Sequence, residues 1–204
     1  MQIKEIKQKI LMMAQEVLKM WQMTHRAFME HNRQLSSDIL KSETVINNLE
    51  REISEALVVL GKSSRDKKER LMITSYIDIV GDLEMIGDYC KDILERIEIK
   101  IEERLFFSDD AVRDYNELYD KTEGFLKRVV EAIVKDDVSA IKDITIQEPI
   151  DKIVEGIRSR HDQRLINGIC SPFASNMFLN IVDFTIAVFK HTQNIANNLL
   201  KIEL

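Results

Sequence analysis

Apolar side chains recur at every third or fourth position over long stretches of the chain, and this periodicity restricts the fold more than any other feature. In the first stretch, Ile3, Ile10 and Val17 repeat at one heptad position. Among 204 residues there are only six Gly and two Pro, so turn-forming residues rarely interrupt the pattern. The predicted fold class is therefore all-α, with six long helices joined by short connections.

The helix boundaries follow from capping residues and from breaks in the apolar pattern. Ser36-Ser37-Asp38 and Ser108 offer capping oxygens for the second and fourth helices, and Asn167-Gly168 forms a C-cap pair. Ser171-Pro172 opens the last helix. The helices are expected at residues 2–35, 36–60, 68–104, 108–135, 136–167 and 172–201. Pro149 lies within the fifth of these and should kink it.

The helical pattern repeats within the chain. A shift of 101 residues aligns residues 41–53 with residues 142–154, where apolar positions coincide and Glu50 falls on Asp151. The alternative explanation is that any two amphipathic helices share some register. We interpret the repeat as a duplication that gives two tandem three-helix units, residues 1–107 and residues 108–204.

Charge and cysteine content exclude several classes of protein. A formal net charge of −6 argues against binding to nucleic acid, which needs clustered Lys and Arg. Cys90 and Cys170 show no metal-binding or disulfide spacing, so we interpret both as free thiols in a reducing compartment. We found no apolar run of the roughly 20 residues that a membrane-spanning helix needs. The chain itself is expected to be water-soluble.

Two acidic residues on the third helix stand apart from its core stripe. Glu84 and Asp88 are four residues apart, so they point the same way from successive turns of the helix. On a helical wheel they lie on the side opposite the stripe that contains Ile79, Leu83 and Ile86. Solvent, a cation or a protein partner would each offset the repulsion between the two carboxylates, and the spacing alone does not choose among them.

Three segments of the chain resemble a known family. Val45–Ile53 (VINNLEREI) on the second helix and Asp82–Tyr89 (DLEMIGDY) on the third resemble the PhoU family of phosphate-uptake regulators. Arg164–Pro172 (RLINGICSP) resembles the PhoU-type domains appended to bacterial sodium/phosphate cotransporters. The resemblance implies a regulator of phosphate transport and phosphate signalling that is not an enzyme. It would bind a phosphate transporter or a sensor protein at the cytoplasmic face of the membrane.

The resemblance also implies a metal site, because acidic residues on the second and third helices of such units can hold metal ions. The matching residues of the first unit lie at similar heights on two antiparallel helices, and they are Glu43, Asn47, Glu50, Glu84 and Asp88. Oxygen ligands suit Mg²⁺, Ca²⁺ or iron, and Asn47 stands where the family has an acid, which predicts weaker binding. Because Ile186 and Lys190 replace the acids in the second unit, we expect one site at most and no other cofactor.

Two further expectations concern assembly and alternative functions. The first helix is rich in Met and carries apolar residues at three heptad positions. The resulting apolar face is wider than one three-helix unit can cover. We therefore expect a homodimer. The competing hypotheses are a metal-binding or metal-storing protein and a purely structural dimerising bundle. The sequence leaves open whether the chain is a standalone regulator or the soluble domain of a transporter.

Overall fold

The computed structural model describes residues 2–30, 32–142 and 150–203, and it confirms the all-α fold class. The described part of the chain contains helices and no strand. The helices are α1 (Ile3–Glu30), α2 (Arg33–Ser63), α3 (Lys67–Glu102), α4 (Asp109–Lys135), α5 (Ser139–Lys142), α7 (Asp151–Ile166) and α8 (Pro172–Glu203).

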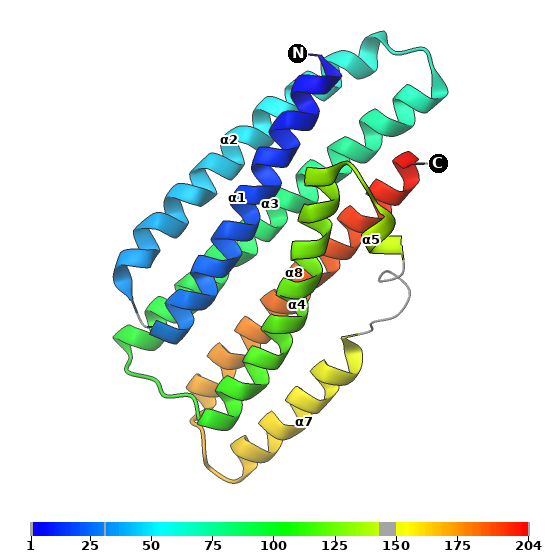
Figure 1. The fold of residues 1–204 in the computed structure, drawn as a ribbon. Helices are drawn as coiled ribbons and strands as arrows, with labels where there is room; N and C mark the ends of the chain where they lie inside the picture. The colour runs from blue at the N-terminus through cyan, green and yellow to red at the C-terminus, as the bar shows by residue number, and fades with distance from the viewer. Residues whose placement is uncertain (1, 31, 143–149, 204) are drawn as a thin grey trace.

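The helices form one elongated bundle (Figure 1). α1, α2 and α3 pack against one another, and α8 runs along α3. α4 lies against both α1 and α8, while α7 covers the lower half of α4. The buried apolar side chains of both predicted units form a single core cluster. The predicted boundary at residue 107 falls in the connection between α3 and α4.

Capping side chains explain the starts of α2, α3, α4 and α8, including one that we predicted wrongly. The first helix ends at Glu30 instead of continuing to residue 35, and α2 begins at Arg33. The cap is Asn32, whose side-chain oxygen accepts a hydrogen bond from the Gln34 backbone N–H at 2.9 Å. Ser108 caps α4 as predicted, with a hydrogen bond from the Ala111 N–H at 3.2 Å.

The predicted start of the fifth helix at residue 136 is also wrong. Asp136 adopts a left-handed conformation, with φ of 52°, and its N–H ends α4 by bonding to the Ala132 and Ile133 carbonyls. Asp137 then accepts a hydrogen bond from the Ser139 N–H at 2.9 Å, so helix resumes only at Ser139. The kink expected at Pro149 lies outside the described residues.

The wide apolar surface of α1 is covered from within the chain. Trp21 stacks on Tyr119 of α4 with ring centroids 5.2 Å apart, and Phe28 meets Tyr115 at 4.4 Å. His25 stacks on the same Tyr119 at 3.6 Å. α4 therefore covers the apolar surface of α1 for which we expected a second protomer. A homodimer stays a prediction, without this argument in its favour.

By length and composition, α8 is apolar enough to cross a membrane, which the sequence analysis overlooked. Half of the residues in its most apolar window are buried inside the bundle. They include Phe178, Ile181, Val188 and Ile195, which belong to the core cluster. Packing against α3 and α4 thus accounts for the apolar character of this helix.

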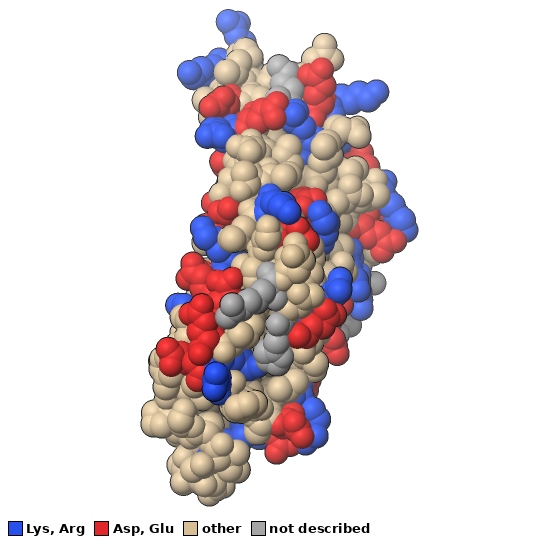
Figure 2. Space-filling view, turned by 90° about the vertical axis from the view of Figure 1, so that its left-hand side faces the viewer, with Lys and Arg blue, Asp and Glu red and all other residues tan. Residues whose placement is uncertain are grey.

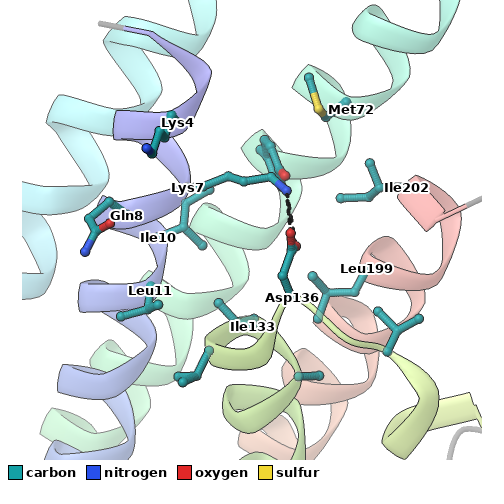
Figure 3. A pocket seen from close by; sticks show the side chains of 14 residues that line it. Lys4, Lys7, Gln8, Ile10, Leu11, Met72, Ile133, Asp136, Leu199 and Ile202 are labelled. Atoms are coloured by element: carbon teal, nitrogen blue, oxygen red, sulfur yellow. Dashed lines mark hydrogen bonds and ion pairs between the residues drawn. The ribbon is translucent and has the colours of Figure 1, made fainter.

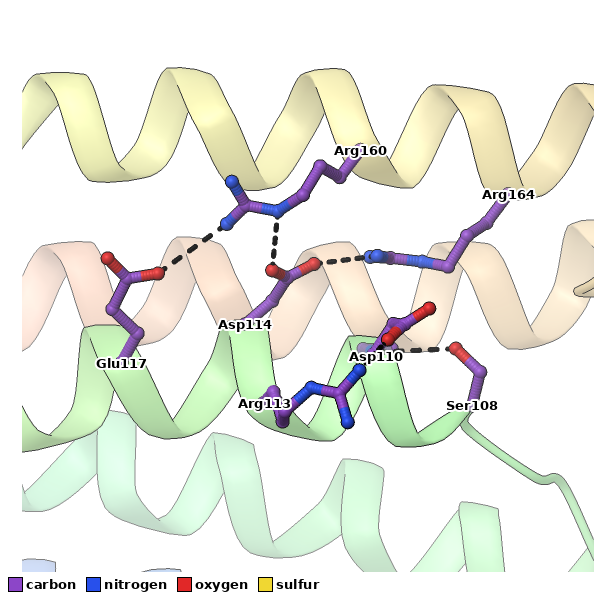
Figure 4. A network of polar contacts seen from close by, with 8 residues as sticks. Ser108, Asp110, Arg113, Asp114, Glu117, Arg160 and Arg164 are labelled. Carbon is purple, nitrogen blue, oxygen red and sulfur yellow. Dashed lines mark hydrogen bonds and ion pairs between the residues drawn. The ribbon is translucent and has the colours of Figure 1, made fainter.

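α7 is attached mainly through polar contacts, because only Ile157, His161 and Arg164 are buried on it. Figure 4 shows that Asp114 of α4 forms ion pairs with two arginines of α7. Arg160 Nε lies 2.7 Å from one carboxylate oxygen, and Arg164 Nη1 lies 2.7 Å from the other. The side chains of Asp114 and Arg164 are each 7 % exposed, so this part of the network is nearly closed to solvent.

We expect Asp114→Asn to release α7 while leaving the α1–α3 core folded. Breaking a buried ion pair costs about 3–5 kcal/mol, because the remaining charge is left buried without compensation. Hydrogen exchange followed by mass spectrometry should show faster exchange in residues 151–166. The matched control is Asp110→Asn, which removes an exposed pair with Arg113 on the same helix. Unchanged exchange of α7 in Asp114→Asn would show that other contacts hold it.

Candidate functional site

The structure brings the five sequence-predicted site residues onto facing turns of α2 and α3. All five side chains are half-buried. We use "acidic cluster" for the four carboxylates among them, Glu43, Glu50, Glu84 and Asp88.

A glycine on α3 brings the two helices close together beside the acidic cluster. Gly87 precedes Asp88 and is buried against Ile46 of α2. A Cβ atom at this position would lie 3.3 Å from Ile46 Cδ1, which is tighter than ordinary van der Waals contact. The missing side chain thus lets α2 approach α3 and places the carboxylates of the two helices near one another.

The carboxylates of the acidic cluster repel one another. The pKa of Glu84 is raised, first because burial disfavours its charged form and then because Asp88, Glu50 and Glu43 are negatively charged. A hydrogen bond with Asp88 adds to the same effect. Glu84 therefore holds its proton more firmly than a free glutamate does, and any cation that approached the cluster would relieve this repulsion.

Neighbouring side chains already compensate part of this charge. Lys91 Nζ lies 3.3 Å from Glu43 Oε1, and the Asn47 amide donates to the same oxygen at 2.9 Å. Ser54 donates to Glu50 at 2.8 Å. Within residues 2–30, 32–142 and 150–203, no three His, Cys, Asp or Glu side chains are placed to hold one metal ion. The residues predicted as ligands are gathered, but they do not form a ready coordination site.

Lys91 is a residue of this candidate site that the sequence analysis missed. It follows Asp88 by three residues, so it lies on the same face of α3 one turn further along. The sequence spacing alone could therefore have indicated that Lys91 lies next to Asp88. Its pairing with Glu43, 48 residues earlier in the chain, depends on how α2 and α3 pack.

Asp82, the first residue of the motif on α3, has a different role from Glu84 and Asp88. Its carboxylate faces α8, where His191 Nδ1 lies 2.7 Å from Oδ1 and the Asn194 amide donates at 3.2 Å. These contacts link α3 to α8. The motif therefore contributes one acid to packing between helices and two acids to the acidic cluster.

The described residues of the second unit contain no equivalent of the acidic cluster. Ile186 is half-buried and Lys190 is exposed at the matching positions of α8. Residues 143–149, which precede α7, lie outside the described residues. The charge pattern needed for a cation site is thus confined to α2 and α3 among the described helices.

Comparison with known proteins confirms the resemblance to the PhoU family. Residues 10–97 match the family model of the PhoU domain, and this range contains all five predicted site residues. A Thermotoga maritima protein described as "Phosphate-specific transport system accessory protein PhoU homolog 1" is 25 % identical over 174 residues. That match covers 84 % of this chain and 74 % of the Thermotoga protein.

Two solved structures share the fold. PhoU from Pseudomonas aeruginosa superposes with a TM-score of 0.87 at 18 % identity, covering 98 % of this chain and 96 % of that one. PhoU from Streptococcus pneumoniae gives 0.84 at 17 % identity, covering 98 % and 94 %. The likeness to the sodium/phosphate cotransporter domain stays a prediction.

We expect Glu84→Gln to stabilise the protein at neutral pH. The pKa of Glu84 is raised in the folded state, so losing its proton costs more free energy in the folded protein than in the unfolded chain. The contribution of this group to stability is therefore greatest below the unfolded pKa and is lost as pH rises through the folded pKa. Above that pKa, the neutral amide removes a repelled charge. Chemical denaturation at pH 7 should show the gain, which should disappear below pH of about 4.

The control is Glu98→Gln, an exposed glutamate on the same helix and outside the acidic cluster. It should show no comparable pH-dependent gain. Equal stability of wild type and Glu84→Gln at neutral pH would mean that the cluster is not under electrostatic strain.

Proposed function

We propose that this chain is a regulator of phosphate transport that acts by binding a transporter or sensor protein at the cytoplasmic face of the membrane. The observation that carries the proposal is the PhoU-domain match over residues 10–97, joined to the similarity with the Thermotoga phosphate-transport accessory protein. The role is regulatory and not catalytic.

The acidic cluster is one surface suited to such a partner. Its carboxylates are half-buried, close together and only partly compensated by Lys91. A partner that inserts a Lys or Arg side chain would relieve the repulsion at Glu84, and complementary charge of this kind favours fast and specific association. We therefore propose a basic segment of the transporter or sensor as the element that binds here.

A second surface suited to contact is the turn between α7 and α8, within the segment that resembles cotransporter domains. Ile166 is 76 % exposed and Ile169 is 59 % exposed, and no residue from 165 to 173 is charged. Figure 1 places this turn at the lowest end of the molecule, and the lowest end is free of charged side chains in Figure 2. Apolar ends of this kind favour docking onto another protein.

The two arrangements left open by the sequence remain part of the proposal. The chain is either a standalone regulator or the soluble domain of a sodium/phosphate cotransporter. The complete reading frame of the gene distinguishes them, because a transporter would add membrane-spanning segments to this chain.

Reversing the charge of the acidic cluster tests the regulatory role. In a strain lacking the gene, the wild-type chain should restore normal control of radiolabelled phosphate uptake, and Glu84→Lys with Asp88→Lys should not. The matched control is Glu131→Lys, an exposed acid that pairs with Lys135 on α4. Full control of uptake by the folded double variant would contradict a role for the cluster. A gene deletion that leaves uptake unchanged would contradict the regulatory role itself.

The second candidate function is metal binding by Glu50, Glu84 and Asp88, joined by Glu43 and Asn47. The raised pKa of Glu84 favours it, since burial and excess negative charge produce that shift. Because Lys91 already pairs with Glu43, a divalent cation or iron would have to displace this ammonium group to recruit Glu43.

Calorimetric titration with Mn²⁺, Fe²⁺ and Zn²⁺ tests this candidate. Lys91→Ala should strengthen binding by freeing Glu43, and Glu84→Ala with Asp88→Ala should remove it. Lys127→Ala, which removes an exposed lysine on α4, serves as the control for loss of positive charge. Identical titrations of wild type, Lys91→Ala and the double variant would reject the metal site.

A further inference from the structure

A cavity of about 440 Å³ lies where α1, α3, α4 and α8 converge, away from the acidic cluster (Figure 3). Its volume is within the range of small-molecule binding sites in proteins. Apolar walls come from all four helices and include Leu11, Met72, Ile133, Leu199 and Ile202. Each of these side chains remains partly exposed, and together they line one cavity that is partly open to solvent.

The cavity has a positively charged side formed by α1. Lys4 and Lys7 both line it, and Figure 3 shows Lys7 reaching across toward Asp136 at the end of α4. Lys7 Nζ lies 3.1 Å from each carboxylate oxygen of Asp136. Among the residues that the structure describes, Lys4 forms no ion pair. Two lysines and one aspartate leave a net charge of +1 at this side.

The pair between Lys7 and Asp136 is open to exchange. The two side chains are 43 % and 81 % exposed, and ion pairs with this much contact with water contribute little to stability. The pKa of Lys7 is raised, because Asp136 and Tyr76 together outweigh the opposing effect of burial. Lys7 is thus charged at neutral pH and can bind another anion in place of Asp136.

We propose that this cavity binds a single-chain amphiphilic anion, with its apolar chain between Leu11, Ile133 and Leu199 and its carboxylate on Lys4 and Lys7. An amphiphilic cation would be repelled by the two lysines that line the cavity. A small hydrophilic anion would leave the apolar walls without a partner. The ligand would touch helices from both predicted units, so its binding stabilises their packing.

Decanoate, used below its micellar concentration, is a suitable probe. Calorimetry should show one saturable site, and thermal unfolding should shift to higher temperature as decanoate is added. Lys4→Ala with Lys7→Ala should weaken binding at least about tenfold, since two charge-assisted hydrogen bonds are lost. Ile133→Glu, which places a carboxylate within the apolar walls, should weaken binding as well.

Two controls separate this site from unspecific adsorption. Lys9→Ala removes a lysine of the same helix that pairs with Glu52 outside the cavity, and it should bind decanoate like wild type. Decylamine, with the same chain and the opposite charge, should not raise the unfolding temperature.

The proposal is overturned if decanoate shows no saturable binding to the wild-type protein. It is also overturned if the double lysine variant and Ile133→Glu both bind like wild type, or if decylamine protects equally well. If the double lysine variant does not fold, Ile133→Glu and the comparison of decanoate with decylamine decide the question.

Discussion

The packing of α3 against α8 is the contact on which the rest of the structure depends. α3 touches α1 and α2 on one side and α8 on the other, and α4 adds a second link between the two groups because it packs on both α1 and α8. Its buried stripe includes Ile79, Leu83, Ile86 and Ile93. Burial of each such side chain contributes about 1.5–3 kcal/mol, which makes this stripe a large share of the core.

The chemistry of the acidic cluster is a consequence of that packing. Because the core stripe takes up one side of α3, Glu84 and Asp88 are left on the side that faces the edge of α2. Gly87 then allows α2 to come close enough to half-bury the carboxylates. On an isolated helix the same residues would be solvated, and the repulsion at Glu84 would be small.

Sequence reasoning predicted the helices, because they depend on local spacing. It predicted the gathering of the acids from the family resemblance and from the antiparallel pairing of two helices. It placed the start of α2 at Ser36 when Asn32 is the cap, since several polar residues in that region can cap a helix. It could not find the pairs Lys91–Glu43 and Arg164–Asp114, which join residues far apart in the chain. The cover of α1 by α4 and the cavity at Lys7 likewise depend on tertiary packing, which no local pattern encodes.

The two predicted units share one core, and the packing of α3 against α8 joins them. Trp21 is the only Trp in the chain, and it lies in the first unit while stacking on Tyr119 of the second. Equilibrium unfolding in denaturant, followed both by Trp fluorescence and by helical circular dichroism, tests the claim most directly. A shared core predicts that the main transitions coincide. Two separated transitions, with roughly half of the helical signal lost in each, would contradict it.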